Sequence, residues 1–140
     1  MERRDREGLM KAVDTNVLLR YILNDDGNQF AISSSFLKAR TVEDPAFVSH
    51  IVLCELTWTL RRRYGYSAMQ TAAVVAALFE TAEIAIEDEA EISPLLSNAA
   101  PGADIADILI SFRAKRSGCD VTVSFDRHAA KTVPGMELLA

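Results

Sequence analysis

Acidic residues stand at the ends of several segments of the sequence that are typical of β-strands. Asp14 ends a short apolar segment, and Asp126 follows the β-branched segment 121–125. Glu55 lies in the second turn of a helix that is expected to follow a further strand. In sheets of parallel strands, ligands bind beyond the carboxyl ends of the strands. We therefore expect these three acids to contribute to one site.

Two further acids, Asp104 and Asp107, open the helix that is expected before the segment 121–125. Residues three apart share a face of an α-helix, so both carboxylates face the same way as Ser111. The same spacing also fits a helix cap, in which Asp104 is the N-cap and Asp107 is the third helical residue. For Asp104 the sequence leaves the site and the cap open, whereas for Asp107 the site is the preferred interpretation.

Carboxylates gathered in this way require a compensating positive charge. Two carboxylates about 4 Å apart repel each other by roughly 4 kcal/mol at an effective dielectric constant near 20. Hard oxygen ligands without cysteine or histidine favour Mg²⁺ or Mn²⁺. Such an ion can polarise a phosphodiester, generate a hydroxide and stabilise a leaving oxygen. A helix that begins at Thr15 or Asn16 would direct backbone N–H groups toward the same place, which favours a phosphate group.

Alternating helix and strand patterns are expected to position these acids. Apolar periodicity and capping residues predict helices at residues 15–23, 29–40, 50–64, 67–80, 87–98, 104–117 and a short one that ends at Lys131. Short apolar or β-branched segments predict strands at residues 11–14, 45–49, 84–86, 121–125 and 136–139. Strands that alternate with helices through short loops indicate an α/β protein. We expect a three-layer α/β/α sandwich with a mostly parallel central sheet of about five strands.

The composition is that of one ordinary globular domain. The chain has 140 residues, of which 49% are hydrophobic and 25% are charged, and its net charge is −5. Residues 1–10 are expected to form a flexible tail and residues 11–140 a single domain. No apolar leader and no long apolar run is visible, so we expect no membrane association. Cys54 and Cys119 make no disulfide framework, and we expect both to be buried and free in the reducing cytoplasm.

Four segments of the chain resemble, in order, the motifs of the PIN domain. They read AVDTNVLL at residues 12–19, LCEL at 53–56, GADIADILI at 102–110 and TVSFD at 122–126. Their order and spacing are similar to those of the small VapC-type ribonuclease toxins of type II toxin–antitoxin pairs. The resemblance extends from about Lys11 to Leu139, and four motifs in order in a chain of this size are a specific signal.

The resemblance implies a metal-dependent endoribonuclease with a shallow acidic site that holds Mg²⁺ or Mn²⁺. Its four acidic positions would be taken by Asp14, Glu55, Asp107 and Asp126. Asp107 is preferred because its separation from Asp126 is nearer the spacing of the family than that of Asp104, which would assist as a further metal ligand. Asn16 and Ser124 would be supporting polar groups that orient the carboxylates.

The resemblance also implies protein partners. Family members usually form homodimers and are held inactive by a cognate antitoxin, which has a DNA-binding end and a tail that lies in the toxin groove. A heterotetramer or larger assembly with the antitoxin would follow. The acidic net charge excludes RNA binding by bulk positive charge, so we expect local arginines to contact RNA phosphates, with Arg62 and Arg116 as candidates.

Three other interpretations stay open at this stage. A PIN-like nuclease could act in RNA processing outside toxin biology, and an antitoxin reading frame directly upstream would argue against that role. A non-catalytic, Mg²⁺-binding phospho-acceptor signalling domain also gathers acids, but it requires an acid pair after its first strand, where this chain offers only Asp14. His50, Cys54, Cys119 and His128 could be drawn as a zinc site, although their spacing matches no tight Cys-x-x-Cys pattern.

Overall fold

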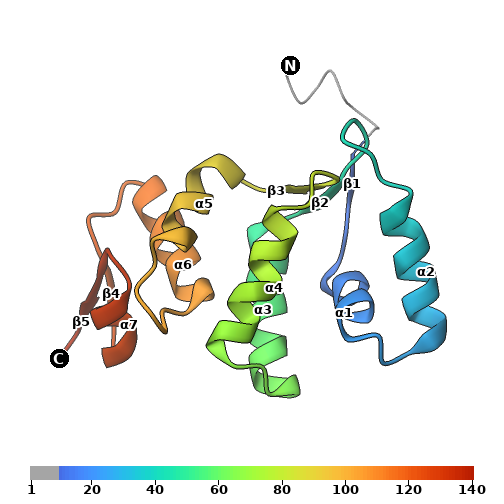
Figure 1. Ribbon diagram of the computed structural model, residues 1–140. Coiled ribbons are helices and arrows are strands. Elements are labelled where there is room, and N and C mark those ends of the chain that lie inside the picture. The colour runs from blue at the N-terminus through green and yellow to red at the C-terminus, as the bar shows by residue number, and fades with distance from the viewer. Residues whose placement is uncertain (1–9) are drawn as a thin grey trace. The chain divides into compact units, whose positions relative to one another are not determined.

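The computed structural model describes residues 10–140, which fall into two compact units. The first unit contains the described residues up to Leu56 together with Val75–Glu87, and the second contains Thr57–Val74 and Asp88–Ala140. Within this part of the chain, seven helices and five strands follow one another (Figure 1). Residues 1–9 of the predicted tail lie outside the described residues.

The first unit contains a three-stranded parallel sheet. Its strands, hydrogen-bonded in the order given, are β1 (Lys11–Ala12), β2 (Ala46–Val48) and β3 (Ile84–Ile86). Ala12 pairs with Phe47, which pairs in turn with Ala85. In β2 and β3 the first and third side chains are buried and the middle one is half-buried, as expected for parallel strands that are covered on both faces.

Helices α1 (Thr15–Leu23) and α2 (Gly27–Lys38) follow β1 and contact each other. α1 ends at Asn24, which adopts the left-handed conformation (φ 51°) that asparagine tolerates better than most residues. α2 begins two residues earlier than predicted. The reason is that the Asp26 carboxylate accepts a hydrogen bond from the backbone N–H of Gln29 and so caps the helix at that point.

Helix α3 (His50–Tyr64) begins in the first unit and ends in the second, and α4 (Ala68–Phe79) begins in the second and ends in the first. The bounds of α3 are those predicted from the sequence. Gly65 ends α3 with φ 70°, a left-handed conformation that glycine adopts without strain. A capping box then starts α4: Ser67 Oγ accepts from the N–H of Gln70, and the Gln70 side chain accepts from the N–H of Ser67.

The second unit contains a two-stranded parallel sheet and three further helices. These elements are α5 (Glu89–Ser97), α6 (Ile105–Arg116), β4 (Thr122–Ser124), α7 (Arg127–Thr132) and β5 (Met136–Leu138). Ile92 of α5 and Ile108 of α6 are buried in its core. α5 begins later than predicted because Glu87 still belongs to the strand pairing, where its N–H donates to O of Val48 (3.0 Å).

The predicted α/β class and the parallel pairing of the strands are confirmed. All five predicted strands are present among residues 10–140, three in one hydrogen-bonded sheet and two in another. Each strand has only two or three residues, and most of the fully buried apolar side chains belong to helices. None of the described helices is both long enough and apolar enough to cross a membrane.

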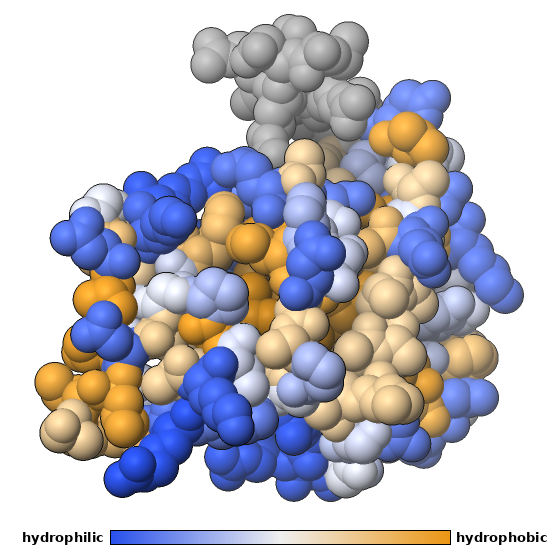
Figure 2. All heavy atoms as spheres, turned by 60° about the vertical axis from the view of Figure 1, so that its left-hand side comes forward, coloured by the Kyte–Doolittle hydropathy of each residue, from blue (hydrophilic) through white to orange (hydrophobic). Residues whose placement is uncertain are grey.

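Several large apolar side chains remain at the surface. Figure 2 shows apolar side chains between hydrophilic ones on the face that it presents. Phe125 is 79% exposed beside β4, and Trp58 is 54% exposed on α3. The prediction that both cysteines are buried is wrong for Cys119, which lies exposed in the connection between α6 and β4. Cys54 is half-buried, and neither cysteine is part of a disulfide bond.

Candidate functional site

Asp104 and Asp107 lie at the start of α6. Asp104 is the N-cap residue, and its Oδ1 accepts a hydrogen bond of 2.8 Å from the backbone N–H of Ala106. Its other oxygen, Oδ2, lies 3.2 Å from Nη1 of Arg61 in an ion pair. The helix cap that the sequence left open for Asp104 is therefore present, and both oxygens of this carboxylate have partners.

Asp126 joins β4 to α7. Its backbone N–H donates to Oγ of Ser124 (3.0 Å), and its Oδ1 accepts from the backbone N–H of Ala129 (3.0 Å). Asp126 is thus the N-cap residue of α7, and the helix follows the strand at once. Ser124 holds the turn that carries this acid, through the backbone and not through the carboxylate.

The acids of the second unit interact electrostatically. Burial raises the pKa of Asp107 above its ordinary range, and the negative charges of Asp104 and Asp126 raise it further. The imidazole of His128 acts in the opposite direction. Asp104, Asp107 and Asp126 therefore form one electrostatic group within the second unit.

His128 was not among the predicted site residues. Its Nε2 lies 2.8 Å from O of Gly102, in the turn before α6, which places the ring next to the start of that helix. Gly102 has φ 82°, and a Cβ at this position would lie 3.5 Å from the His128 ring. The sequence signal that could have found His128 is its place two residues after Asp126, in the first turn of α7.

The other two predicted acids, Asp14 after β1 and Glu55 on α3, lie in the first unit. The backbone N–H of Val13 donates to O of Phe47 (3.0 Å), which extends the strand pairing to the residue before Asp14. Asp14 is the N-cap residue of α1, yet its carboxylate makes no capping hydrogen bond. Thr15 is buried, and its hydroxyl donates to a carboxylate oxygen of Glu55 from α3. The Glu55 carboxylate is thereby tied to the start of α1.

The remaining predicted residues are exposed. Asn16 lies in the first turn of α1. Arg62 of α3 has its guanidinium carbon 6.0 Å from the centre of the Trp58 ring. Arg116 forms an ion pair of 2.5 Å with Asp88, so part of its charge is neutralised within its own unit. Of the two arginines predicted to contact RNA, Arg62 therefore offers the more available charge.

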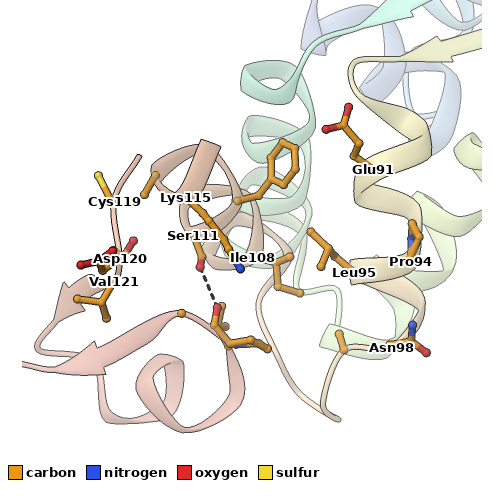
Figure 3. A pocket seen from close by; sticks show the side chains of 17 residues that line it. Glu91, Pro94, Leu95, Asn98, Ile108, Ser111, Lys115, Cys119, Asp120 and Val121 are labelled. Atoms are coloured by element: carbon orange, nitrogen blue, oxygen red, sulfur yellow. Dashed lines mark hydrogen bonds between the residues drawn. The ribbon is translucent and has the colours of Figure 1, made fainter. Parts of the chain in front are cut away.

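A pocket of about 460 Å³ lies elsewhere in the second unit (Figure 3). Its walls come from α5, α6 and the segments 119–122 and 133–135, and they are mostly apolar. Ser111 Oγ donates a hydrogen bond of 2.8 Å to O of Pro134 in one wall, drawn as a dashed line. The predicted acids, all of them among the described residues, do not line this pocket. The candidate site is therefore the set of predicted acids and not this pocket.

Comparison with known protein families gives a result that covers most of the chain. The family model of the PIN domain matches residues 11–133. The chain belongs to the PIN domain family. A comparison with curated proteins finds no match. PIN domains are typically Mg²⁺-dependent nucleases, and the PIN match spans every acid named above.

The donor groups of this PIN domain suit a hard divalent cation. In the second unit they are the carboxylate oxygens of Asp104, Asp107 and Asp126. In the first unit they are those of Asp14 and Glu55. Burial and then the negative charges of Asp104 and Asp126 raise the pKa of Asp107, and a nearby cation would favour the charged carboxylate. Carboxylate oxygens are also the ligands that Mg²⁺ and Mn²⁺ prefer. The residues therefore fit the divalent metal that PIN domains use.

The first unit of the PIN domain contains a further pair with metal-ligating chemistry. His50 opens α3 and Glu87 follows β3, and a ligand atom of each lies within 4.8 Å of the other. Oε1 of Glu87 accepts from the backbone N–H of His50 (2.8 Å), and O of Glu87 lies 2.9 Å from Nε2 of the imidazole. His50 is buried, and these bonds join the start of α3 to the end of β3. We interpret the pair as a structural link.

Sequence reasoning missed two partners of the predicted acids in the PIN domain. Neither Arg61 nor the Thr15 hydroxyl was predicted to lie beside these acids, but they bind Asp104 and Glu55. The partners are separated by 43 and 40 residues, so no local spacing could have signalled them.

Proposed function

We propose that this PIN domain is a Mg²⁺- or Mn²⁺-dependent endoribonuclease that hydrolyses RNA phosphodiester bonds. The observation that carries the proposal is the set of acids at the starts of α6 and α7, where burial and the charges of Asp104 and Asp126 also raise the pKa of Asp107. A divalent cation favours the charged form of a carboxylate whose ionisation is opposed by burial and by neighbouring negative charges. Membership of a family of nucleases supports the same conclusion.

We assign the metal-binding and catalytic roles to the carboxylates of Asp14, Glu55, Asp107 and Asp126, with Asp104 assisting. Asp107 is the primary acid of α6, because both oxygens of Asp104 already have partners. The Asp107 carboxylate has no hydrogen bond or ion pair within the described part of the chain. The carboxylate of Asp14 is likewise unused by the helix that it begins. Asp126 caps α7 with Oδ1, which leaves Oδ2 for a ligand.

Other residues support these carboxylates. The Thr15 hydroxyl fixes one oxygen of Glu55, and Ser124 fixes the turn that carries Asp126. Asn16 stands in the first turn of α1, where unpaired backbone N–H groups favour a phosphate. A bound divalent cation would supply positive charge to the scissile phosphate and lower the pKa of water.

The test is RNA cleavage by variants that keep the shape of the acid but not its charge. We expect Asp14→Asn and Asp126→Asn to lower the cleavage rate at least about 100-fold, because each removes several kcal/mol of charge stabilisation at the metal. The matched control is Asp120→Asn, which changes an exposed acid of the second unit and should cleave like the wild type. Circular dichroism checks that all variants are folded. Cleavage at the wild-type rate by Asp126→Asn would remove the assignment.

We further propose that the nuclease is the toxin of a toxin–antitoxin pair and acts in the cytoplasm. The support is the order and spacing of the four motifs, which resemble VapC-type toxins. The proposal includes a homodimer, a cognate antitoxin protein and a heterotetramer or larger complex between them. Expression of the wild type alone should arrest growth of a bacterial host, and Asp126→Asn should not. Normal growth during active RNA cleavage would favour a role in RNA processing instead.

A further inference from the structure

Trp58 is the single tryptophan of the chain and stands on α3 within the second unit. More than half of its surface is exposed. We propose that Trp58 is a stacking platform for a base of single-stranded RNA, and that the guanidinium of Arg62 holds an adjoining phosphate. This inference rests on the RNA substrate proposed above and adds the residues that recognise it.

Trp58 and Arg62 together have the chemistry of a nucleotide site. They are four residues apart on α3, about one turn, and the guanidinium carbon lies 6.0 Å from the centre of the indole ring. An indole presents a flat π-face on which any base can stack, and a guanidinium presents paired N–H donors that match a phosphate. Both side chains are exposed, so a strand can reach them without rearrangement of the helix.

The charge around Trp58 is complementary to RNA. Arg61, Arg62 and Arg63 follow one another at the end of α3, and all three are exposed. Arg61 is paired with Asp104, but Arg62 and Arg63 add positive charge locally to a chain whose net charge is −5. A neutral apolar partner would gain nothing from the guanidinium of Arg62 beside the indole. Single-stranded RNA uses both the aromatic face and the charge.

The same turn of α3 is connected to the acids within the second unit. Arg61 lies three residues beyond Trp58, about 4.5 Å along the helix axis. Its Nη1 forms the 3.2 Å ion pair with Asp104, whose charge acts on Asp107. The platform is therefore one helical turn from an arginine that contacts the acidic group. A strand bound to Trp58 is presented to the acids that we propose to cleave it.

The experiment uses the fluorescence of Trp58, which is not masked by another tryptophan. The full chain with Asp126→Asn, which prevents cleavage, is titrated in Mg²⁺ with a single-stranded RNA of about 12 nucleotides, within the usual site size for such proteins. We expect saturable quenching of the fluorescence. An abasic strand of the same length keeps the phosphates but has no bases to stack, so it should bind with much weaker quenching.

Affinities are measured separately by the anisotropy of labelled RNA, in the same Asp126→Asn background. Trp58→Ala should weaken binding roughly 5- to 100-fold, the range expected for one base–aromatic stack, and Trp58→Phe should weaken it less. Arg62→Ala should reduce the salt dependence by about one phosphate contact. The matched control is Met69→Ala in the same unit, because Met69 is 83% exposed but offers no π-face. Its affinity should equal that of the parent.

Two results would overturn the inference. One is unquenched fluorescence at saturating RNA together with unchanged affinity of Trp58→Ala. The other is loss of self-association in Trp58→Ala at unchanged RNA affinity, measured by sedimentation, which would assign the patch to an interface between copies of the chain. If the wild type cleaves RNA but Trp58 affects neither fluorescence quenching nor RNA affinity, only this inference fails. If RNA quenches the fluorescence but the wild type does not cleave it, only the nuclease proposal fails.

Discussion

The guanidinium of Arg61 lies 3.2 Å from Oδ2 of Asp104, while Oδ1 of the same carboxylate caps α6 through the N–H of Ala106. One carboxylate thus joins the end of α3 to the first turn of α6. Burial raises the pKa of Asp107, and the negative charge of Asp104 raises it further. Asp104 is therefore occupied by local structure, and Asp107 keeps a carboxylate that is available to a metal.

Substitutions of Asp104 should separate its capping role from its charge. We expect Asp104→Ala to lower the free energy of unfolding by about 1 kcal/mol, because the N-cap is lost. Asp104→Asn keeps a good cap and loses only an exposed ion pair, so its stability should fall by less than about 1 kcal/mol. Urea unfolding measures both. Cleavage by Asp104→Asn should stay within about tenfold of the wild type, whereas Asp107→Asn should lose at least about 100-fold. Equal losses of cleavage rate in Asp104→Asn and Asp107→Asn would contradict our assignment of Asp107 as the primary acid of α6.

The raised pKa of Asp107 predicts a pH-dependent stability in metal-free protein. Because the folded protein binds this proton more tightly than the unfolded chain, ionisation of Asp107 lowers stability. The loss is absent below the unfolded pKa of about 3.9 and complete above the raised folded pKa. Asp107→Asn should therefore match the wild type at low pH and become the more stable protein as the pH rises to 7. Screening by solvent keeps the difference below about 1 kcal/mol.

This prediction is checked by urea unfolding with EDTA across that pH range. The prediction would be contradicted if the free energies of unfolding of Asp107→Asn and the wild type differed by the same amount at every pH. Addition of Mg²⁺ at pH 7 should make the wild type the more stable protein, because a cation that binds the native state stabilises the wild type more than the variant.

Thr15 is predicted to position Glu55 for the reaction. Thr15→Val keeps the shape of the buried side chain but removes the hydroxyl that donates to the Glu55 carboxylate. We expect kcat for RNA cleavage to fall about 10- to 100-fold, the usual effect of losing a group that orients a metal ligand, with little change in KM. Thr15→Ser restores the hydroxyl and should recover most of the rate. A wild-type kcat in Thr15→Val would show that this hydrogen bond has no part in catalysis.

Gly135 is predicted to be intolerant of a side chain. A Cβ at this position would lie 2.6 Å from Oγ of Ser111, and the backbone φ is 89°. Gly135→Ala should therefore destabilise the protein by about 2 kcal/mol or more, through backbone strain and displacement of the Ser111 hydroxyl from its bond to O of Pro134. The control is Gly27→Ala at the start of α2, where no atom lies within 4 Å of the added carbon. That variant should change stability by less than about 1 kcal/mol in urea unfolding.

Local signals in the sequence were enough to predict the elements and the kind of chemistry. The bounds of α3 and of β3 agree with those predicted, and α4 begins within one residue of its predicted start. Hydrophobic periodicity and helix caps act over three or four residues, so they can be read directly from the chain. The order of the acidic motifs likewise predicted the family, which the match over residues 11–133 confirms.

The partners of each acid were decided only by the tertiary structure. The Arg61–Asp104 and Thr15–Glu55 contacts join residues 43 and 40 positions apart. Local sequence patterns do not link residues that are so far apart in the chain. The sequence favoured Asp107 over Asp104 only by its spacing from Asp126. The ion pair that Arg61 of another helix makes with Asp104 supports that preference and could not be predicted from the spacing. Hydrogen bonding and desolvation depend on distances in the folded protein, and packing places residues in contact that are far apart in the sequence.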